Sequence, residues 1–235
     1  MLIFLDLETT GLSREDKICS IALLFEESYI YELVNEGKKI PPEASSIHHI
    51  TNEMIKTKPK LHETQCYSKL LECNNEENIL VGHNIAFDLA MLAQSGFVWS
   101  GKVIDTLRLT KHLTPECELF GLQFLRYELR LYKQEEKILQ SYGIKDALLA
   151  HNALSDALLV KLLFEYHAEM VCEEEMIALS QKKVLLSKLS FGKYKMHYIE
   201  EIAMSDRAYL EWMLKVADID EDLRYSLEYY LKESR

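Results

Sequence analysis

Short apolar runs separated by polar segments dominate the N-terminal part of the chain. The runs at residues 1–5, 17–25 and 29–34 have the length of β-strands, and only residues 26–28 separate the second run from the third. So short a connection implies an antiparallel hairpin. The three runs therefore predict an antiparallel meander.

Beyond the meander, strands and helices alternate. Pro41 and Pro42 open an expected loop region over residues 41–54, and a helix is expected over 62–73. Short strands are expected at 79–81 and 103–106, with a helix between them that Asn84 caps and that ends near Gln94, before Gly96. The pattern predicts an α/β fold, in which a mixed five-stranded sheet of an antiparallel meander plus parallel strands has helices on both faces.

The pattern changes again after residue 172. A helix is expected from Glu173 to about Leu189, then a short strand pair, then helices of which the last spans Asp220 to Lys232. The chain of 235 residues has room for one domain of good size and a small appendage. We therefore predict a larger domain over residues 1–172 and a small α+β module over 173–235.

Composition narrows the setting in which the protein works. The sequence has five cysteines, an odd number, and no CxxC pair, which favours free thiols in a reducing compartment over disulfides or a zinc site. No signal peptide and no membrane-spanning run is evident, so a cytoplasmic location is expected. The formal charge of −11 argues against nucleic-acid binding by bulk electrostatics, but not against an enzyme that holds nucleic acid through metals and a few cations.

Two carboxylates follow the first apolar run at a spacing of two. Side chains alternate across a strand, so Asp6 and Glu8 point to the same side. Unpaired carboxylates in an apolar strand are costly and repel each other, and a divalent cation removes both problems. Thr9, Thr10 and Gly11 then open a loop where backbone can approach a ligand. The alternative is that both acids simply face water at a sheet edge.

Three further polar residues occur at element ends. Asp88 falls in the first turns of the expected helix after residue 84, near the strand ends where sites form in such sheets, although an acid there also suits the positive helix N-terminus. His151 and Asp156 would diverge by roughly 140° on one regular helix. They can serve one site only if His151 lies at or before the helix start; otherwise they belong to a polar loop and a solvated face.

In this order, the motifs resemble a known enzyme family. They are Asp-x-Glu-Thr-Thr-Gly-Leu from Asp6, His-Asn-x-x-Phe-Asp ending at Asp88, and His-x-Ala-x-x-Asp-Ala from His151. The set resembles the DEDDh exonucleases, the family around the proofreading (epsilon, DnaQ-like) subunit of bacterial DNA polymerase III, over residues 1 to about 170. Residues 104–106 and 47–51 are similar to secondary family signatures, with His49 where many members carry Gly. The later residues resemble the C-terminal module of exonuclease X-like proteins.

The resemblance implies a ribonuclease H-like fold and a role for each motif residue. Asp6, Glu8, Asp88 and Asp156 would hold two divalent cations, with Asp6 bridging both, Glu8 and Asp156 completing one site and Asp88 reaching the other through water. Oxygen ligands suit Mg²⁺ or Mn²⁺, and two ions about 4 Å apart can clamp a phosphodiester. His151 would be the general base, since histidine titrates near neutral pH.

The terminal-nucleotide pocket is also implied by the resemblance. Its lining would comprise Thr9, Leu12, Asn84 and Phe87. For Leu12 and Phe87, ordinary core packing is the competing interpretation. Asn152 stands where the related tyrosine-type class would have tyrosine, so the histidine type is favoured.

The resulting expectation is a metal-dependent 3′–5′ exonuclease that releases nucleoside 5′-monophosphates from DNA 3′ ends, single-stranded or frayed, in repair or proofreading. Association with a polymerase or self-association is compatible with this expectation, and no membrane partner is expected. One alternative is an exoribonuclease of the same fold, similar to ribonuclease T or oligoribonuclease. The other is a non-catalytic polymerase-associated module, which would be expected to have lost one of the five site residues.

A local excess of positive charge occurs near the C-terminus. Between Gln181 and Ile199 there are five lysines and no acid, with Phe191, Tyr194 and Tyr198 interleaved. This mixture is typical of a phosphate track with stacking platforms, although a charge run is also typical of a solvated surface. We call these five residues the lysine strip: Lys182, Lys183, Lys188, Lys193 and Lys195.

Overall fold

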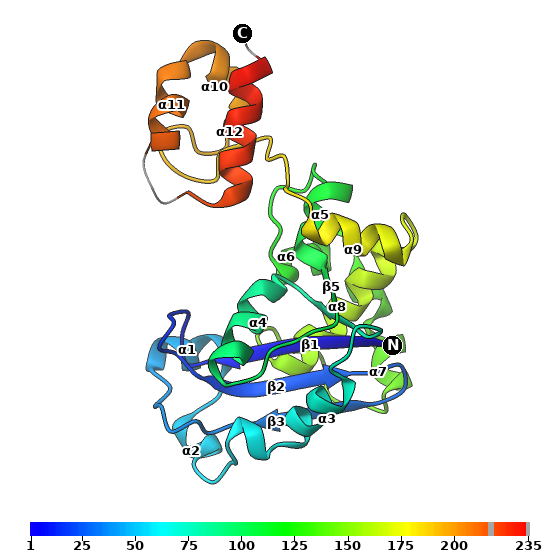
Figure 1. Cartoon of the computed structure of the whole chain (residues 1–235). Helices are drawn as coiled ribbons and strands as arrows, with labels where there is room; N and C mark the ends of the chain where they lie inside the picture. The colour runs from blue at the N-terminus through cyan, green and yellow to red at the C-terminus, as the bar shows by residue number, and fades with distance from the viewer. Residues whose placement is uncertain (216–218, 234–235) are drawn as a thin grey trace.

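A computed structural model describes residues 1–215 and 219–233 and contains the predicted five-stranded mixed sheet (Figure 1). The strand order is β3-β2-β1-β4-β5, in which β1 pairs antiparallel with β2 and parallel with β4. The strands are β1 (Leu2–Thr9), β2 (Ile18–Leu24), β3 (Tyr29–Leu33), β4 (Ile79–Gly82) and β5 (Lys102–Asp105). The meander and the two later strands are confirmed.

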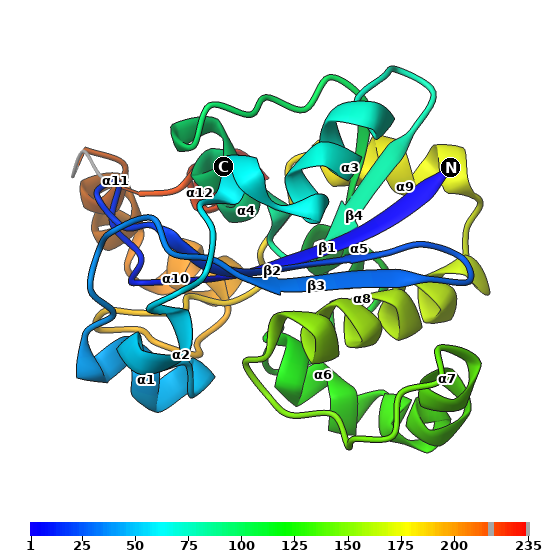
Figure 2. The ribbon, with the colours of Figure 1, turned by 90° about the horizontal axis from the view of Figure 1, so that it is seen from below.

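Helices cover both faces of the sheet and create two apolar cores (Figure 2). On one face, α8 (Ala153–Ala168) packs over β1 and β2, and its neighbours include Phe4. On the other face lie α3 (Gln65–Cys73) and α4 (Ile85–Gln94), against the opposite side chains of β1 such as Leu5. All seven residues of β2 are buried, which explains its uninterrupted apolar sequence.

The loop expected over residues 41–54 is instead largely helical, so that prediction is wrong. It contains α1 (Pro42–His48) and α2 (Asn52–Ile55). Pro42 occupies the first turn of α1, where proline is preorganised and its missing N–H has no intrahelical partner to lose. The Thr51 side chain accepts the Met54 N–H and starts α2.

Helix ends also differ from the sequence prediction. The helix expected over 62–73 is divided into a 3₁₀ turn (Leu61–Glu63) and α3, because Thr64 caps α3 by accepting the Tyr67 N–H. Asn84 does precede α4, but its side chain makes no capping bond: the residue is left-handed at φ 60°, and its N–H donates to Asp105 Oδ1 at 3.0 Å. Gly96 has φ 86°, as a helix-terminating glycine requires.

Short helices connect β5 to α8. Thr106, predicted as the last strand residue, already begins a helix because the Asp105 side chain accepts the N–H of Leu107 and caps it. The connecting helices are α5 (Thr106–Leu113), α6 (Leu122–Glu128), a 3₁₀ turn (Leu131–Gln134) and α7 (Glu135–Ser141).

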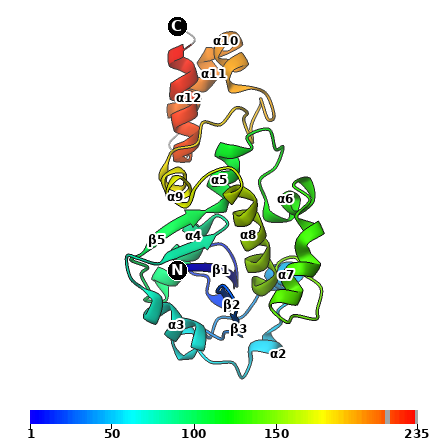
Figure 3. The ribbon, with the colours of Figure 1, turned by 90° about the vertical axis from the view of Figure 1, so that its right-hand side faces the viewer.

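The C-terminal part has its own core beyond α9 (Glu173–Gln181). The helix ends at Gln181, short of the predicted Leu189, because Lys182 is extended and its carbonyl accepts a bond from Arg108. Met176 of α9 belongs to the larger domain's core, whereas a separate cluster lies among α10 (Ile199–Ser205), α11 (Arg207–Lys215) and α12 (Glu221–Glu233) (Figure 3). The boundary after residue 172 stays a prediction, and packing associates α9 with the larger domain.

The strand pair expected in this module is reduced to one antiparallel bridge, between Lys188 and Tyr198. The intervening chain folds into turns, with Gly192 at φ 78°, instead of extending. Arg108 of α5 holds the module by a bidentate ion pair to Asp222 of α12, at 3.0 and 3.1 Å. Among the described residues, no helix is long and apolar enough to cross a membrane.

Candidate active site

Three carboxylates meet where β1 faces the start of α8. Asp6 and Glu8 share one side of β1, as their spacing predicted, and Asp156 lies in the first turn of α8. One ligand oxygen from each of Asp6, Glu8 and Asp156 lies within 4.8 Å of the other two. The apolar residues that surround Asp156 on α8 bury the helix on the sheet, and this packing forces the three acids together.

The electrostatics of this cluster favour a cation. Burial raises the pKa of Asp6 well above its usual range, and the charges of Asp156, Asp88 and Glu8 raise it further. Burial, followed by the charge of Asp156, raises the pKa of Glu8 to about 8. Burial raises the pKa of Asp156 to about 6. Oxygen donors that repel one another at this separation fit Mg²⁺ or Mn²⁺.

Asp88 approaches the same cluster from α4. It is buried, and burial raises its pKa well above the usual range, with further increases from the charges of Asp105 and Glu8. The backbone N–H groups of Asp88 itself and of Leu7 lower this pKa and partly offset the effect. Asp88 is not one of the three acids within 4.8 Å, so its contact with a cation through water stays a prediction.

His151 lies just before α8, the only position at which it and Asp156 could share a site. The Asn152 side chain caps α8 by accepting the Ser155 N–H at 3.2 Å, and His151 is left-handed at φ 57° with its side chain exposed. The backbone N–H groups of His151 and Asn152 both lower the pKa of the Asp156 carboxylate. The position of His151 is therefore tied to a site acid, and its role as base stays a prediction.

The loop after β1 is fixed by a buried acid that sequence reasoning missed. Asp16 accepts bonds from Thr10 Oγ1 at 2.9 Å, from the Ser13 N–H at 2.8 Å and from Lys38 Nζ at 2.7 Å. These partners hold the pKa of Asp16 well below its usual range, led by the bond from Lys38. Gly11 is required here, because a Cβ would lie 2.6 Å from Asp16 Oδ2.

The four predicted pocket residues differ in burial. Leu12 is 86% exposed at the tip of this loop, so core packing is excluded for it. Phe87 is half-buried and packs against the core on the α3–α4 side, while Asn84 is exposed and Thr9 is buried. The pocket roles of Thr9, Leu12, Asn84 and Phe87 stay predictions.

Gln123 of α6 is a second contact that the sequence did not reveal. Its Nε2 donates to Asp156 Oδ1 at 2.7 Å. The two residues are 33 positions apart in the sequence, and no motif joins them. Only the packing of α6 on α8 brings them together.

The lysine strip lies in the C-terminal module, away from the acids on the sheet (Figure 1). Lys193 is partly neutralised, since its Nζ lies 3.1 Å from Asp206 Oδ2. The Lys188 ammonium lies 4.7 Å from the centre of the Tyr198 ring. The strip lies between the end of α9 at Gln181 and the start of α10 at Ile199, where a helix to about Leu189 and then a short strand pair were expected.

Comparison with known proteins identifies the family of the chain. Residues 3–164 match the family model described as Exonuclease, so the chain belongs to this exonuclease family and is a nuclease. Residues 189–218 match the Exodeoxyribonuclease X-like C-terminal family. Both resemblances expected from the motifs are thereby confirmed.

Two curated proteins and one solved structure are similar to this chain. The chain is 26% identical over 243 residues to Exodeoxyribonuclease 10 of Escherichia coli (strain K12), covering 100% of both proteins. It is 33% identical over 122 residues to the DNA polymerase III subunit epsilon of Treponema pallidum (strain Nichols), covering 47% of this chain and 55% of that one. The fold matches a structure described as Exonuclease X in complex with 5′ overhanging duplex DNA, with a TM-score of 0.61 and 24% identity over 77% of this chain and 99% of that one.

Proposed function

We propose that this nuclease is a two-metal-ion 3′–5′ exodeoxyribonuclease that removes nucleoside 5′-monophosphates from DNA 3′ ends. The observation that carries the proposal is the group formed by Asp6, Glu8 and Asp156, three acids with ligand oxygens within 4.8 Å of one another. Their raised pKa values mean that the fold destabilises the charged carboxylates, and a bound cation would remove this destabilisation.

The residues divide the chemical work among them. Asp6, Glu8 and Asp156 would hold one Mg²⁺ or Mn²⁺, and Asp6 with Asp88 would hold the second; such ions supply charge stabilisation to both oxygens of a displaced phosphodiester. The imidazole of His151, exposed at the start of α8, would accept the proton of the attacking water. Thr9, at the end of β1, and Leu12, on the loop fixed by Asp16, would position the terminal nucleotide.

DNA is the favoured substrate because a relative that matches along the full length of both chains is named an exodeoxyribonuclease. A non-catalytic role is disfavoured because all four acids and His151 are present in the sequence and because Asp6, Glu8 and Asp156 have ligand oxygens within 4.8 Å of one another. The five cysteines are free, which supports a reducing compartment such as the cytoplasm. Association with a polymerase stays a prediction, which the similarity to a DNA polymerase III subunit epsilon supports.

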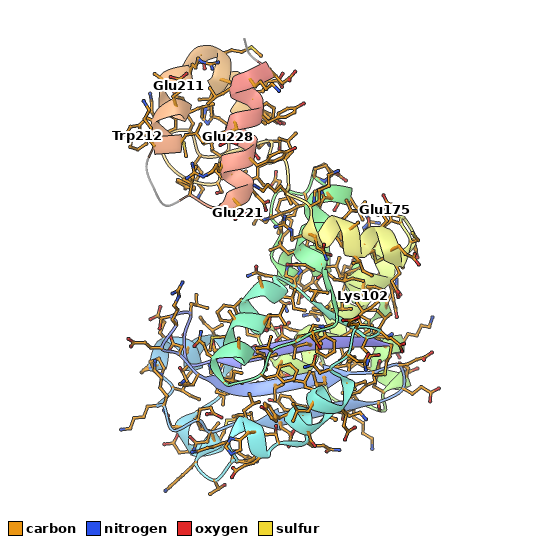
Figure 4. The ribbon with its side chains drawn as sticks, viewed as in Figure 1. Lys102, Glu175, Glu211, Trp212, Glu221 and Glu228 are labelled. Atoms are coloured by element: carbon orange, nitrogen blue, oxygen red, sulfur yellow. The ribbon has the colours of Figure 1, made fainter. Side chains whose placement is uncertain are left out.

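We further propose that the lysine strip holds nucleic acid beyond the active site. Phe191 and Tyr198 are each 48% exposed beside these lysines, as stacking platforms would be. Trp212, 56% exposed, lies on the outer side of α11 (Figure 4) and contacts the Tyr209 ring at a centroid distance of 5.7 Å. These rings enlarge the aromatic surface next to the strip.

A side-by-side digestion assay tests the function. Two sets of strands, one labelled at the 5′ end and one at the 3′-terminal nucleotide, are incubated with Mg²⁺, with Mn²⁺ or with EDTA. Each set comprises single-stranded DNA, duplex DNA with either overhang and single-stranded RNA. We expect a ladder that shortens from the 3′ end on DNA, release of mononucleotides, and no products with EDTA. Faster digestion of RNA would establish the exoribonuclease alternative, and absence of products on every substrate would refute the nuclease mechanism.

A further inference from the structure

Asp156 is held by a second helix in addition to its own. Gln123 Nε2, on α6, donates to Asp156 Oδ1 at 2.7 Å. Asp156 is buried and Gln123 is half-buried, so water competes poorly for this bond. A carboxylate has two oxygens; this bond uses Oδ1 and leaves Oδ2 for another partner.

The orientation of the Gln123 amide is itself fixed. Arg126, one turn further along α6, donates from Nη1 to Gln123 Oε1 at 3.3 Å. The same guanidinium makes a bidentate pair with Glu135 at the start of α7, at 2.6 and 2.7 Å. The Arg126 and Glu135 side chains are only 12% and 15% exposed. Since guanidinium can only donate, Oε1 must face Arg126, and the NH₂ group must face Asp156.

We propose that Gln123 is a positioning residue for the metal site and that it sets the orientation of the Asp156 carboxylate. Without this donor, repulsion from Asp6 and Glu8 favours rotation of Asp156 away from the cluster. With it, the carboxylate stays turned toward the other two acids before any cation arrives. Partners of this kind commonly change metal affinity by about 10–100-fold. The inference rests on the proposed function, because it assumes that Asp156 is a metal ligand.

The orientation of Asp156 also bears on His151. The backbone N–H groups of His151 and Asn152 favour the charged form of the Asp156 carboxylate, and the Asp156 N–H donates to the Asn152 carbonyl at 2.8 Å. A rotated carboxylate would lose the first interaction and loosen the turn that carries His151. Loss of the Gln123 donor is therefore expected to reduce kcat more than it raises KM.

Two variants separate positioning from packing. Gln123→Met preserves the length of the side chain and its packing on α8 but removes the donor. Gln123→Glu preserves the shape and replaces the donor by an acceptor, so it provides a second variant if the first fails to fold. Gln140→Met is the matched control, because Gln140 Nε2 also donates to a carboxylate, that of Glu136, at 3.2 Å on the exposed side of α7.

The experiment is calorimetric titration of Mn²⁺ into the full-length metal-free proteins, followed by steady-state kinetics on single-stranded DNA. We expect Gln123→Met to bind Mn²⁺ about 10–100-fold more weakly, Gln123→Glu to bind still more weakly, and Gln140→Met to match the wild type. Circular dichroism and melting temperature confirm that each variant is folded.

The outcomes distinguish the inference from the function on which it rests. If the wild type binds no Mn²⁺, the proposed two-metal function fails. If the wild type binds Mn²⁺ and folded Gln123→Met binds it equally well, the positioning role of Gln123 is overturned while the nuclease mechanism stands. Equal losses in Gln123→Met and Gln140→Met would also overturn it, because the effect would not be specific to Asp156.

Discussion

Asp6 occupies a strand position whose neighbours on both sides, Leu5 and Leu7, belong to the apolar core. A carboxylate there reduces the stability of the metal-free fold, because burial and three nearby acids disfavour its charge. Residues of this kind are retained for chemistry at the expense of stability. The first prediction follows from that conflict.

Asp6→Asn should eliminate nuclease activity and raise the melting temperature of the metal-free protein. The amide keeps the shape of the carboxylate and removes its charge. For a chain of this size, each kcal/mol of relief corresponds to about 2–4 °C. Calorimetry in EDTA measures the shift, and Glu76→Gln, at an exposed acid, serves as control. Wild-type activity in Asp6→Asn would contradict the two-metal mechanism.

The second prediction concerns pH. The pKa values of Glu8, about 8, and Asp156, about 6, lie above those of the unfolded chain, so the folded state binds more protons there. Stability of the metal-free protein should therefore fall as pH rises. Burial lowers the pKa of buried histidines such as His167, to about 4, which gives the opposite slope at lower pH. The test window is therefore about pH 7.5–8.5, above the ordinary histidine pKa of about 6.5.

Melting temperatures in EDTA at pH 7.5, 8 and 8.5 measure this slope. The wild type should lose stability steadily across the window, and Asp6→Asn should show a shallower decline because one member of the repelling cluster is neutral. A melting temperature that rises with pH in the wild type would show that the acids are not destabilised as described.

His151→Gln should reduce kcat by roughly 10²–10⁴-fold, the usual contribution of a general base. The side chain is exposed and no cation ligand is removed, so Mn²⁺ binding should remain. The wild-type pH–rate profile should show an ascending limb near neutrality that the variant lacks. His62→Gln, at another exposed histidine, should behave as wild type. An unchanged profile in His151→Gln would assign the base to another residue.

At the scale of elements, the loop between β1 and β2 is a small folded unit organised by Asp16. Its residues support one another through side-chain bonds, which keep Leu12 exposed at a defined place. Lys38, in the segment after β3, connects this loop to the rest of the domain. The loop thus depends on an interaction between segments that are distant in the sequence.

Lys38→Met should loosen this loop while the sheet stays folded. Loss of a partly exposed ion pair is worth ~1 kcal/mol or less, so KM on DNA should rise by up to about fivefold with little change in metal affinity. Lys39→Met, at the exposed neighbouring lysine, is the control. If KM is the same in both variants and in the wild type, the loop does not position the substrate.

At the scale of the whole molecule, the chain combines an acidic nuclease domain with a module that carries a local cationic segment. Arg108 and Asp222 fix the two parts through an ion pair in which both side chains are largely shielded from water, at 26% and 11% exposure. The bond from Arg108 to the Lys182 carbonyl anchors the first residue of the lysine strip to the same junction. The strip therefore begins at a fixed place relative to the nuclease domain.

The double variant Lys188→Gln with Lys195→Gln should raise KM on long single strands. These lysines are chosen because Lys193 is paired with Asp206. Removal of one lysine–phosphate interaction should reduce the slope of log affinity against log salt by roughly 0.7. Cleavage of a dinucleotide, too short to reach the strip, should not change. The control is Lys133→Gln with Lys137→Gln, two exposed lysines near α7. Equal KM values on long strands in both double variants would leave the strip as a solvated surface.

The sequence by itself determined those features that depend only on residues close together in the chain. The alternation of apolar and polar positions predicted the meander and put Asp6 and Glu8 on one side of β1, because side-chain direction in a strand follows from spacing alone. Helix geometry allowed His151 and Asp156 to serve one site only if His151 lies at or before the helix start, and α8 does begin after it. The family could also be inferred from the sequence, since each of its three motifs is a short continuous stretch of residues.

Only the tertiary structure decided which distant segments meet. Asp156 reaches Asp6 because α8 packs on β1, and Gln123 reaches Asp156 because α6 packs on α8. The helix α9 ends at Gln181 because the Lys182 carbonyl accepts a bond from Arg108. The backbone N–H of Asn84 donates to the Asp105 side chain, and the Asn84 side chain does not cap α4. These helix ends and contacts depend on hydrogen-bond partners from distant segments, which helix propensity and residue spacing do not reveal. Hydrogen bonds between segments become possible only after the core has brought the segments together.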